Sequence, residues 1–311
     1  MNGISHKEAL NILKTESESE LSDIFKMASD ARRKYFGTEI ATCAIINARS
    51  GGCSENCSFC AQSKISKAVF KNYPLLSENR IFRAAEKASE NTVSHFGIVT
   101  SGRAVNISKD LDTICKAVKK ISSELPITPC ASLGILKKEV FEKLKSAGLK
   151  RYHHNLETAG TYFNKICSTR TYKDQIDVVH RAEECGLSVC SGGIFGLGET
   201  KEQRIELLET IRCLGVDSVP INFLNPIPGT KLEGLNELTP VECLKIIAAA
   251  RLMMPDKNIR ICGGREVNLR DFQSWIFSAG ADALMVGNYL VTSGRDIAVD
   301  MKMIEDAGFH L

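Results

Sequence analysis

The sequence of 311 residues lacks long apolar runs, low-complexity segments and a strong excess of charge of either sign. Its 40 Lys and Arg against 37 Asp and Glu give a net charge of +3, so composition offers no reason to expect a nucleic-acid or acidic-membrane partner. No stretch approaches the roughly 18 apolar residues of a transmembrane helix. The first residues also lack the apolar run and cleavage site of a signal peptide, which favours a cytoplasmic protein.

Cysteine is the residue that the sequence has in excess, with 12 against a single Trp. Thiols stay reduced in the cytosol, so a disulfide framework is not expected there. Metal ligation, redox chemistry and burial as small apolar side chains remain as interpretations.

Short apolar segments rich in β-branched residues alternate with amphipathic segments along the chain. Strands are expected near residues 40–46, 93–99, 126–132, 150–155, 187–194, 217–223, 258–262 and 282–286. Helices are expected at 7–14, 19–36, 77–91, 107–123, 136–147, 172–185, 201–213, 239–253 and 269–278. This alternation predicts parallel βαβ units.

The expected fold class is α/β, a (β/α)8 TIM-type barrel, with a doubly wound open sheet as the alternative. An open sheet usually carries a G-x-G-x-x-G turn after its first strand, whereas the glycine-rich segment 193–199 follows the fifth strand and lacks the third glycine. Residues 1–36 are expected to form an N-terminal helical extension, and residues 37–311 the barrel with a C-terminal tail. In a barrel, catalytic groups follow the C-terminal ends of the strands.

Three cysteines follow the first expected strand at the spacing C-x3-C-x2-C: Cys53, Cys57 and Cys60. Three thiolates at this spacing can hold one face of a [4Fe–4S] cluster, and Gly51 and Gly52 allow the chain to turn tightly before them. No fourth cysteine or nearby histidine completes a zinc site. The motif therefore predicts a cluster with one iron open to another ligand.

Four further cysteines lie on alternate expected strands: Cys43, Cys130, Cys190 and Cys262. Side chains inside a barrel pack in layers contributed by alternate strands, so these four thiols could form a ring around the barrel axis. Such a ring suits an auxiliary iron–sulfur cluster, although four buried cysteines could also coincide by chance. The other five are expected to be structural thiols: Cys115, Cys167, Cys185, Cys213 and Cys243.

Polar residues on the expected strands are candidates for binding. Arg260 is two residues before Cys262, so both would point into the barrel, where a guanidinium needs an anion, a sulfide-rich cluster or a carboxylate. Asn155 and Asn222, at the ends of the fourth and sixth strands, offer amide groups to a neutral polar substrate, or cap loops. Glu157 could accept hydrogen bonds from a ribose. The histidines at 153 and 154 are expected to pack or to form hydrogen bonds rather than to act as bases.

The cysteine motif, with Phe59 before its last cysteine, resembles that of radical S-adenosylmethionine (SAM) enzymes. The resemblance implies that SAM occupies the open iron. The segment G-x-I-x-G-x-x-E in that family lies along SAM and matches Gly192, Ile194, Gly196 and Glu199 here.

From about residue 37 to 290 the sequence resembles the biotin synthases more specifically. The matching segments are 152–158, 169–172, 189–194, 218–222 and 249–255. The resemblance implies sulfur insertion into dethiobiotin, with sulfur taken from an auxiliary cluster. It also implies that Asn155 and Asn222 contact substrate, that Asn155 and Glu157 lie near SAM, that flavodoxin or ferredoxin supplies electrons, and that the chain is a homodimer.

The sequence departs from the familiar members of that family at the auxiliary cluster. They hold a [2Fe–2S] cluster with three cysteines and an arginine, and one of those cysteines corresponds to Gly97 here. Cys43 and Cys262 stand where serines are usual, which predicts a different cluster, held by all four strand cysteines. Four cysteines around a barrel could hold a four-iron cluster that carries an extra sulfide for transfer. Gln175 stands where an arginine is expected to face SAM.

Two other functions remain open at this point. A related barrel enzyme, similar to hydrogenase maturases or methylornithine synthases, would share the first cluster but act on another small molecule. A non-catalytic electron carrier would need four ligands for each cluster, which the C-x3-C-x2-C motif does not supply.

Overall fold

The computed structural model describes residues 3–236 and 238–311. The strands in this part of the chain are β1 Ala41–Arg49, β2 His95–Thr100, β3 Thr128–Ser132, β4 Arg151–His153, β5 Ser188–Cys190, β6 Gly193–Phe195, β7 Ser218–Phe223, β8 Asn258–Ile261 and β9 Ala283–Met285. The helices are α1 His6–Lys14, α2 Glu18–Phe36, α3 Glu78–Glu90, α4 Lys109–Glu124, α5 Lys138–Ser146, α6 Gly160–Ile166, α7 Tyr172–Glu184, α8 Lys201–Leu214, α9 Pro240–Met253, α10 Arg265–Leu269, the 3₁₀ helix η1 Arg270–Phe272, α11 Trp275–Ser278 and α12 Ile297–Asp306.

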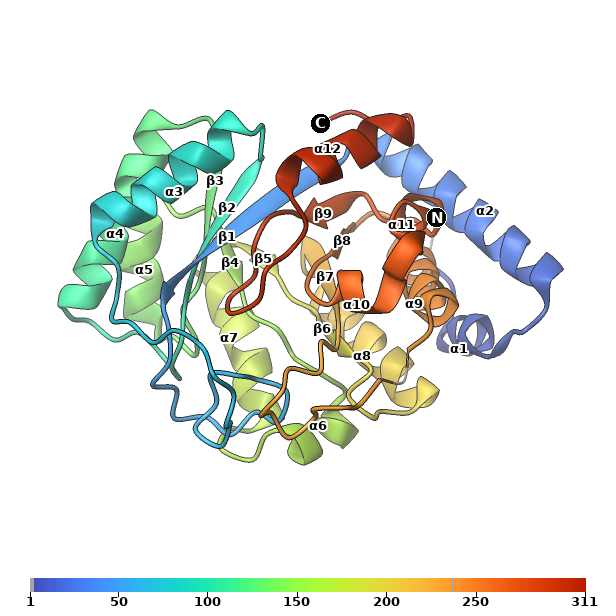
Figure 1. The fold of residues 1–311 in the computed structure, drawn as a ribbon, viewed down its shortest axis with the longest axis horizontal. Helices are drawn as coiled ribbons and strands as arrows, with labels where there is room; N and C mark the ends of the chain where they lie inside the picture. The colour runs from blue at the N-terminus through green and yellow to red at the C-terminus, as the bar shows by residue number, and fades with distance from the viewer. Residues whose placement is uncertain (1–2, 237) are drawn as a thin grey trace.

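The strands form one parallel sheet that closes on itself. Their order is β5-β4-β3-β2-β1-β9-β8-β7-β6, and a pairing of Cys190 with Ser218 joins β5 to β7. The helices surround this sheet (Figure 1). The predicted TIM-type barrel is confirmed, and the open doubly wound sheet is wrong.

The expected fifth strand, 187–194, is two short strands, β5 and β6, instead of one. The break falls at Gly192, where the backbone comes so close to β7 that a Cβ atom would lie 1.9 Å from the carbonyl oxygen of Pro220. Ser191 still donates its N–H to the carbonyl of Ser218 at 3.0 Å. The chain therefore changes direction while staying against β7.

The C-terminal third differs most from the expected elements. In place of one helix at 269–278 the chain forms α10, η1 and α11. Arg270, the first residue of η1, has a positive φ of 49° that no continuous helix allows. Helix α12 was not expected. A buried ion pair between Arg265 of α10 and Asp300 of α12 fixes this last helix.

The two N-terminal helices pack beside α9, as the blue and orange ribbons of Figure 1 show. A capping box of Ser5 and Glu8 begins α1, and its apolar residues Ala9, Ile12 and Leu13 are buried. Because α1, α2, α8 and α11 all contact α9, this helix is apolar around nearly its whole circumference.

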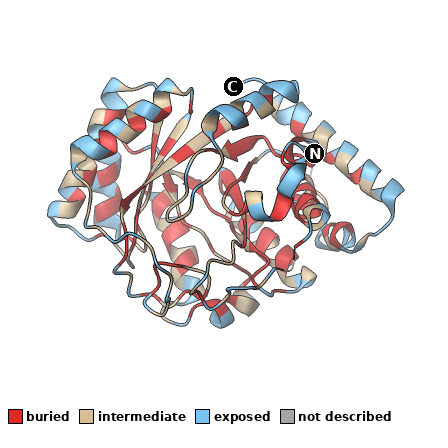
Figure 2. Ribbon diagram, in the orientation of Figure 1, coloured by how far each residue is buried: buried red, intermediate tan, exposed pale blue. Residues whose placement is uncertain are grey.

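Burial follows the layers of the barrel. Strands and the inner faces of the helices are buried, while the outer faces of α2, α3 and α4 are exposed (Figure 2). No helix among the described residues is long and apolar enough to span a membrane.

Candidate active site

A cavity of about 420 Å³ opens inside the barrel, a volume typical of small-molecule sites. It is lined by residues from each of the strands β1 to β9 and by the loops that follow several of them. All seven cysteines assigned to clusters line it: Cys43, Cys53, Cys57, Cys60, Cys130, Cys190 and Cys262. All 12 cysteines are free thiols, and none of the five expected to be structural lines this cavity.

The loop after β1 carries three of these thiols, and two glycines shape its entry. Gly51 and Gly52 have positive φ values of 83° and 66°, and a Cβ atom on Gly51 would lie 1.7 Å from Oδ1 of Asn72. The N–H of Gly51 donates to Oε1 of Gln62 at 2.8 Å, which closes the loop on itself. The tight turn anticipated before the cysteine motif is present.

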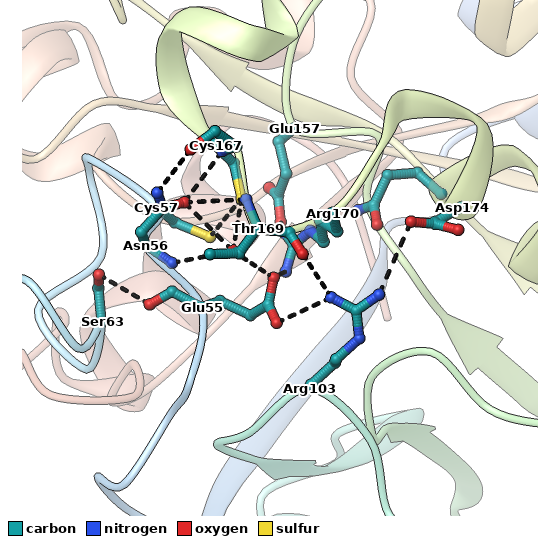
Figure 3. Close-up of polar contacts among 12 residues, drawn as sticks. Glu55, Asn56, Cys57, Ser63, Arg103, Glu157, Cys167, Thr169, Arg170 and Asp174 are labelled. Carbon is teal, nitrogen blue, oxygen red and sulfur yellow. Dashed lines mark hydrogen bonds and ion pairs between the residues drawn. The ribbon is translucent and has the colours of Figure 1, made fainter.

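A polar network holds this loop against the segment that follows α6 (Figure 3). Glu55 is buried, ion-pairs with Arg103 at 3.1 Å and accepts a 2.7 Å hydrogen bond from the hydroxyl of Thr169. Asn56 donates through Nδ2 to Oγ of Ser168 at 2.8 Å, and its Oδ1 accepts from the N–H of Ser168 at 3.0 Å. The cysteine loop is thereby fixed to residues about 110 positions further along the chain.

Glu157 and Arg170 form an ion pair on the cavity wall beside this loop. Their side chains are 16% and 12% exposed and approach to 3.5 Å (Figure 3). Burial raises the pKa of Glu157, and the guanidinium of Arg170 opposes that shift. Arg170 was not singled out from the sequence, although it lies within the matching segment 169–172.

Gln175 does not line the cavity. It is fully buried, and its Nε2 donates to the main-chain carbonyl of Asn155 at 2.9 Å. Asn155 does line the cavity, and its Oδ1 has no hydrogen-bond partner among the described residues. The arginine that faces the cavity from this region is therefore Arg170, and Gln175 supports Asn155 from behind.

The glycine-rich segment meets the cavity through one of its predicted binding residues. Ile194 lines it, as does Phe59 of the cysteine loop, whereas Gly192, Gly196 and Glu199 lie outside the lining. Glu199 accepts hydrogen bonds from the N–H groups of Gly196 and Leu197 at 2.8 and 2.6 Å and ion-pairs with Arg204. Its carboxylate shapes the loop.

The four strand cysteines come together deeper in the barrel, as the alternation of strands predicted. Cys43, Cys130 and Cys190 lie on β1, β3 and β5, and Cys262 directly follows β8 instead of lying on it. A hydrogen bond from Cys262, opposed by burial and helped by Arg260, lowers the pKa of the Cys43 thiol. Burial raises the pKa of Cys130 to about 12.

Arg260 points among these thiols, and no carboxylate of the described residues forms an ion pair with it. Its side chain is 3% exposed, and neither Nη atom has a hydrogen-bond partner among the described residues. Although burial opposes the charge, the nearby sulfurs of Cys43, Cys190 and Cys262 raise the pKa of the guanidinium. Of the alternatives for this arginine, the barrel-end carboxylate is wrong.

Two histidines and a glycine complete the wall around the four thiols. Nδ1 of His153 lies 3.5 Å from Sγ of Cys190. Burial, with the charge of Arg260, lowers the pKa of His95 to about 3, so its ring is neutral. Gly97 lies opposite Cys130 in the pairing of β2 with β3, and it presents no side chain to the cavity.

Asn222 lines the cavity with its amide already engaged. Nδ2 donates to the carbonyl of Gly193 at 3.1 Å, and Oδ1 accepts from the N–H of Gly263 at 3.0 Å. These bonds fix the orientation of the amide. The second N–H of Nδ2 and the second lone pair of Oδ1 remain available to hydrogen-bond a ligand.

The donor set fits two iron–sulfur clusters and a polar cofactor. Seven reduced thiols line one cavity in two groups, and thiolates are the protein ligands of such clusters. The unpartnered guanidinium nitrogens of Arg260 suit an anionic cluster, and the unpartnered Oδ1 of Asn155 suits a hydrogen-bond donor. Among the described residues no three His, Cys, Asp or Glu converge on the position of a single metal ion.

The comparisons with known proteins agree with the barrel and with its thiols. Residues 48–211 match the family model "Radical SAM superfamily", and residues 220–310 match "Biotin and Thiamin Synthesis associated domain". A crystal structure of methylornithine synthase superimposes with a TM-score of 0.86 at 20% identity, covering 99% of this chain and 94% of that one. This likeness shows a shared fold, and with the family match it defines a radical SAM barrel enzyme.

Sequence relatives narrow the class. Biotin synthase of Geotalea uraniireducens (strain Rf4) is 49% identical over 97% of this chain and 92% of its own length. Biotin synthase of Geobacter sulfurreducens (strain ATCC 51573 / DSM 12127 / PCA) is 48% identical over 97% and 92%. The chain belongs to the biotin synthase family.

Proposed function

We propose that the chain converts dethiobiotin to biotin by radical SAM-dependent sulfur insertion, with the sulfur taken from an auxiliary iron–sulfur cluster. The observation that carries the proposal is one cavity lined by two groups of thiols, three on the loop after β1 and four deeper in the barrel. A second cluster suits a sulfurtransferase, which needs a source of sulfur in addition to the cluster that binds SAM.

Cys53, Cys57 and Cys60 would hold the [4Fe–4S] cluster that binds SAM. When bound, this cluster and SAM supply one-electron chemistry that removes hydrogen from unactivated carbon, and the auxiliary cluster supplies sulfur. Phe59 and Ile194 offer an apolar surface to the cofactor.

The polar residues beside this loop would orient SAM. The carboxylate of Glu157 can accept hydrogen bonds from ribose hydroxyls, and Arg170 beside it can face a carboxylate. Asn155 offers an unpartnered Oδ1 to a donor. Gly192, Gly196 and Glu199 would not contact SAM themselves. They would fix the conformation of their loop and so hold Ile194 against the cavity.

Cys43, Cys130, Cys190 and Cys262 would hold the auxiliary cluster, with Arg260 against it. This ligand set differs from the three cysteines and one arginine that hold a [2Fe–2S] cluster in the familiar members, because Cys43 and Cys262 are added and one cysteine is replaced by Gly97. The difference favours a four-iron cluster with an extra sulfide over a [2Fe–2S] cluster. Two auxiliary irons per chain after reconstitution, or full activity of a Cys43→Ala/Cys262→Ala variant, would contradict this assignment.

Dethiobiotin would lie between the two groups of thiols. Asn155 and Asn222 would contact its polar ureido group, Asn222 with an amide whose orientation is already fixed. The loop at 289–292 lines the same cavity, so it would help to exclude water from the reacting carbons. An electron donor such as flavodoxin or ferredoxin, a homodimer and a cytoplasmic location complete the proposal.

The test is an anaerobic assay of the reconstituted protein with dethiobiotin, SAM and a reductant. Biotin should form with wild type and not with a Cys53→Ala/Cys57→Ala/Cys60→Ala variant. Iron and sulfide counts with Mössbauer spectra of the two proteins isolate the auxiliary cluster. SAM cleavage without biotin would instead favour a related enzyme with another substrate.

A further inference from the structure

Cys167 was expected to be one of the structural thiols, but it lies against the cysteine loop. Its Sγ is 3.8 Å from Sγ of Cys57, within hydrogen-bonding distance for two sulfurs, and both side chains are buried (Figure 3). Phe163, Phe59 and Tyr172 pack around the pair. The contact is therefore shielded from water, where a hydrogen bond is electrostatically stronger than at the surface.

The backbone on both sides of this contact is fixed. Cys167 ends α6 and donates its N–H to the carbonyl of Phe163 at 2.9 Å, and the N–H of Ser58 donates to the carbonyl of Ile166 at 2.9 Å. The network of Glu55 and Asn56 holds the next residues of the same segment. These hydrogen bonds fix the backbone next to both cysteines and thereby hold the two sulfurs close together.

We propose, on the basis of the proposed function, that Cys167 is a positioning residue that donates an S–H hydrogen bond to the thiolate of Cys57 when Cys57 ligates the SAM-binding cluster. In the structure the S–H of Cys57 donates to Sγ of Cys167. A thiolate that ligates iron has no proton and can only accept, so Cys167 becomes the donor when Cys57 ligates the cluster. Neither sulfur changes its oxidation state, and no proton is transferred.

Thr169 offers the S–H group its other acceptor, with Oγ1 3.5 Å from Sγ of Cys167. This oxygen already accepts from the N–H of Asn56 at 3.2 Å, and its own hydrogen is directed to Oε2 of Glu55 at 2.7 Å. A charged thiolate is a stronger acceptor than a neutral, already engaged hydroxyl. The S–H group is therefore directed to Cys57.

This hydrogen bond raises the reduction potential of the cluster. Reduction adds negative charge that is shared by the ligating sulfurs, so a donor at Cys57 stabilises the reduced form and raises the potential. Without the donor, the cluster becomes harder to reduce.

The test measures the midpoint potential of the SAM-responsive EPR signal in the reconstituted holoenzyme. Cys167→Ala and Cys167→Val both lack the donor, and valine fills the space, so both should shift the potential to more negative values. Cys167→Ser keeps an O–H donor and should lie between them and wild type. Cys115→Ala, at a half-buried thiol on α4 outside the cavity, should leave the potential unchanged.

An unchanged potential in the valine variant, or equal shifts in the valine and serine variants, would overturn the proposal. The readout does not depend on biotin formation. Failure to make biotin with a shifted potential would refute the proposed function and leave the role of Cys167 standing.

Discussion

The side-chain amide of Gln175 donates to the main-chain carbonyl of Asn155 at 2.9 Å from a fully buried position outside the cavity. This bond ties α7 to the chain just after β4, where Asn155 and Glu157 reach the cavity. Gln175, which stands where an arginine facing SAM is expected, therefore has a structural role. The positive charge that faces the cavity beside Glu157 comes from Arg170.

Replacing Gln175 with methionine should destabilise the protein and weaken SAM binding. Methionine has a similar shape but no donor, so the buried carbonyl of Asn155 loses its partner, at a cost of about 1–3 kcal/mol. The free energy of unfolding of the apoprotein measures this loss, and equilibrium binding of SAM to the reconstituted protein should show a raised Kd. A Kd equal to that of wild type would mean that Gln175 does not position Asn155.

Removing the carboxylate of Glu199 should cost far more stability than removing that of Glu202, three residues further on. Glu199 is 2% exposed in its side chain and ion-pairs with Arg204, so Glu199→Ala leaves a buried charge unpaired, a loss of about 3–5 kcal/mol. Glu202 pairs with Lys14 where both side chains are half exposed, and Glu202→Ala should change little. Denaturant unfolding of the two variants makes the comparison; equal losses would contradict it.

Much of the fold could be predicted from the sequence because strands and helices have their own periodicity. Local spacing predicted the three candidate ligands of the first cluster, and the rule that alternate barrel strands contribute to one layer predicted that the four strand cysteines lie together. All seven of these cysteines line one cavity. The division of the fifth strand was missed because its cause is tertiary. It depends on the close approach of Gly192 to Pro220, which no local pattern reports.

The surroundings of the cysteine loop could not be predicted for the same reason. Asn56 and Ser168 lie 112 positions apart, both in loops, where no periodicity predicts which residues meet. The positions of Arg170 and Cys167 beside the cysteine loop depend on this contact. Only the family resemblance of segment 169–172 pointed to the region at all.

Replacing Arg260 with methionine should reduce the iron and sulfide retained at the auxiliary site. Its guanidinium is buried with two unpartnered nitrogens among Cys43, Cys190 and Cys262, so it would offset the negative charge of a cluster bound by these thiolates. In a Cys53→Ala/Cys57→Ala/Cys60→Ala background, the remaining iron reports this site alone. Arg260→Lys keeps the charge and should retain more iron than Arg260→Met; equal iron in both would show that the charge is not needed.

The buried ring of His154 should make the apoprotein less stable as the pH falls. Burial, with the charge of Arg170, lowers the pKa of His154 from its usual 6.5 to about 3. Between these values the unfolded chain binds a proton that the folded chain does not, so this residue lowers stability by up to about 1.4 kcal/mol for each pH unit below 6.5. His154→Gln should remove that part of the slope. Urea unfolding between pH 4.5 and 7 measures it, with His180→Gln on the exposed face of α7 as the control; identical slopes for wild type and His154→Gln would contradict the prediction.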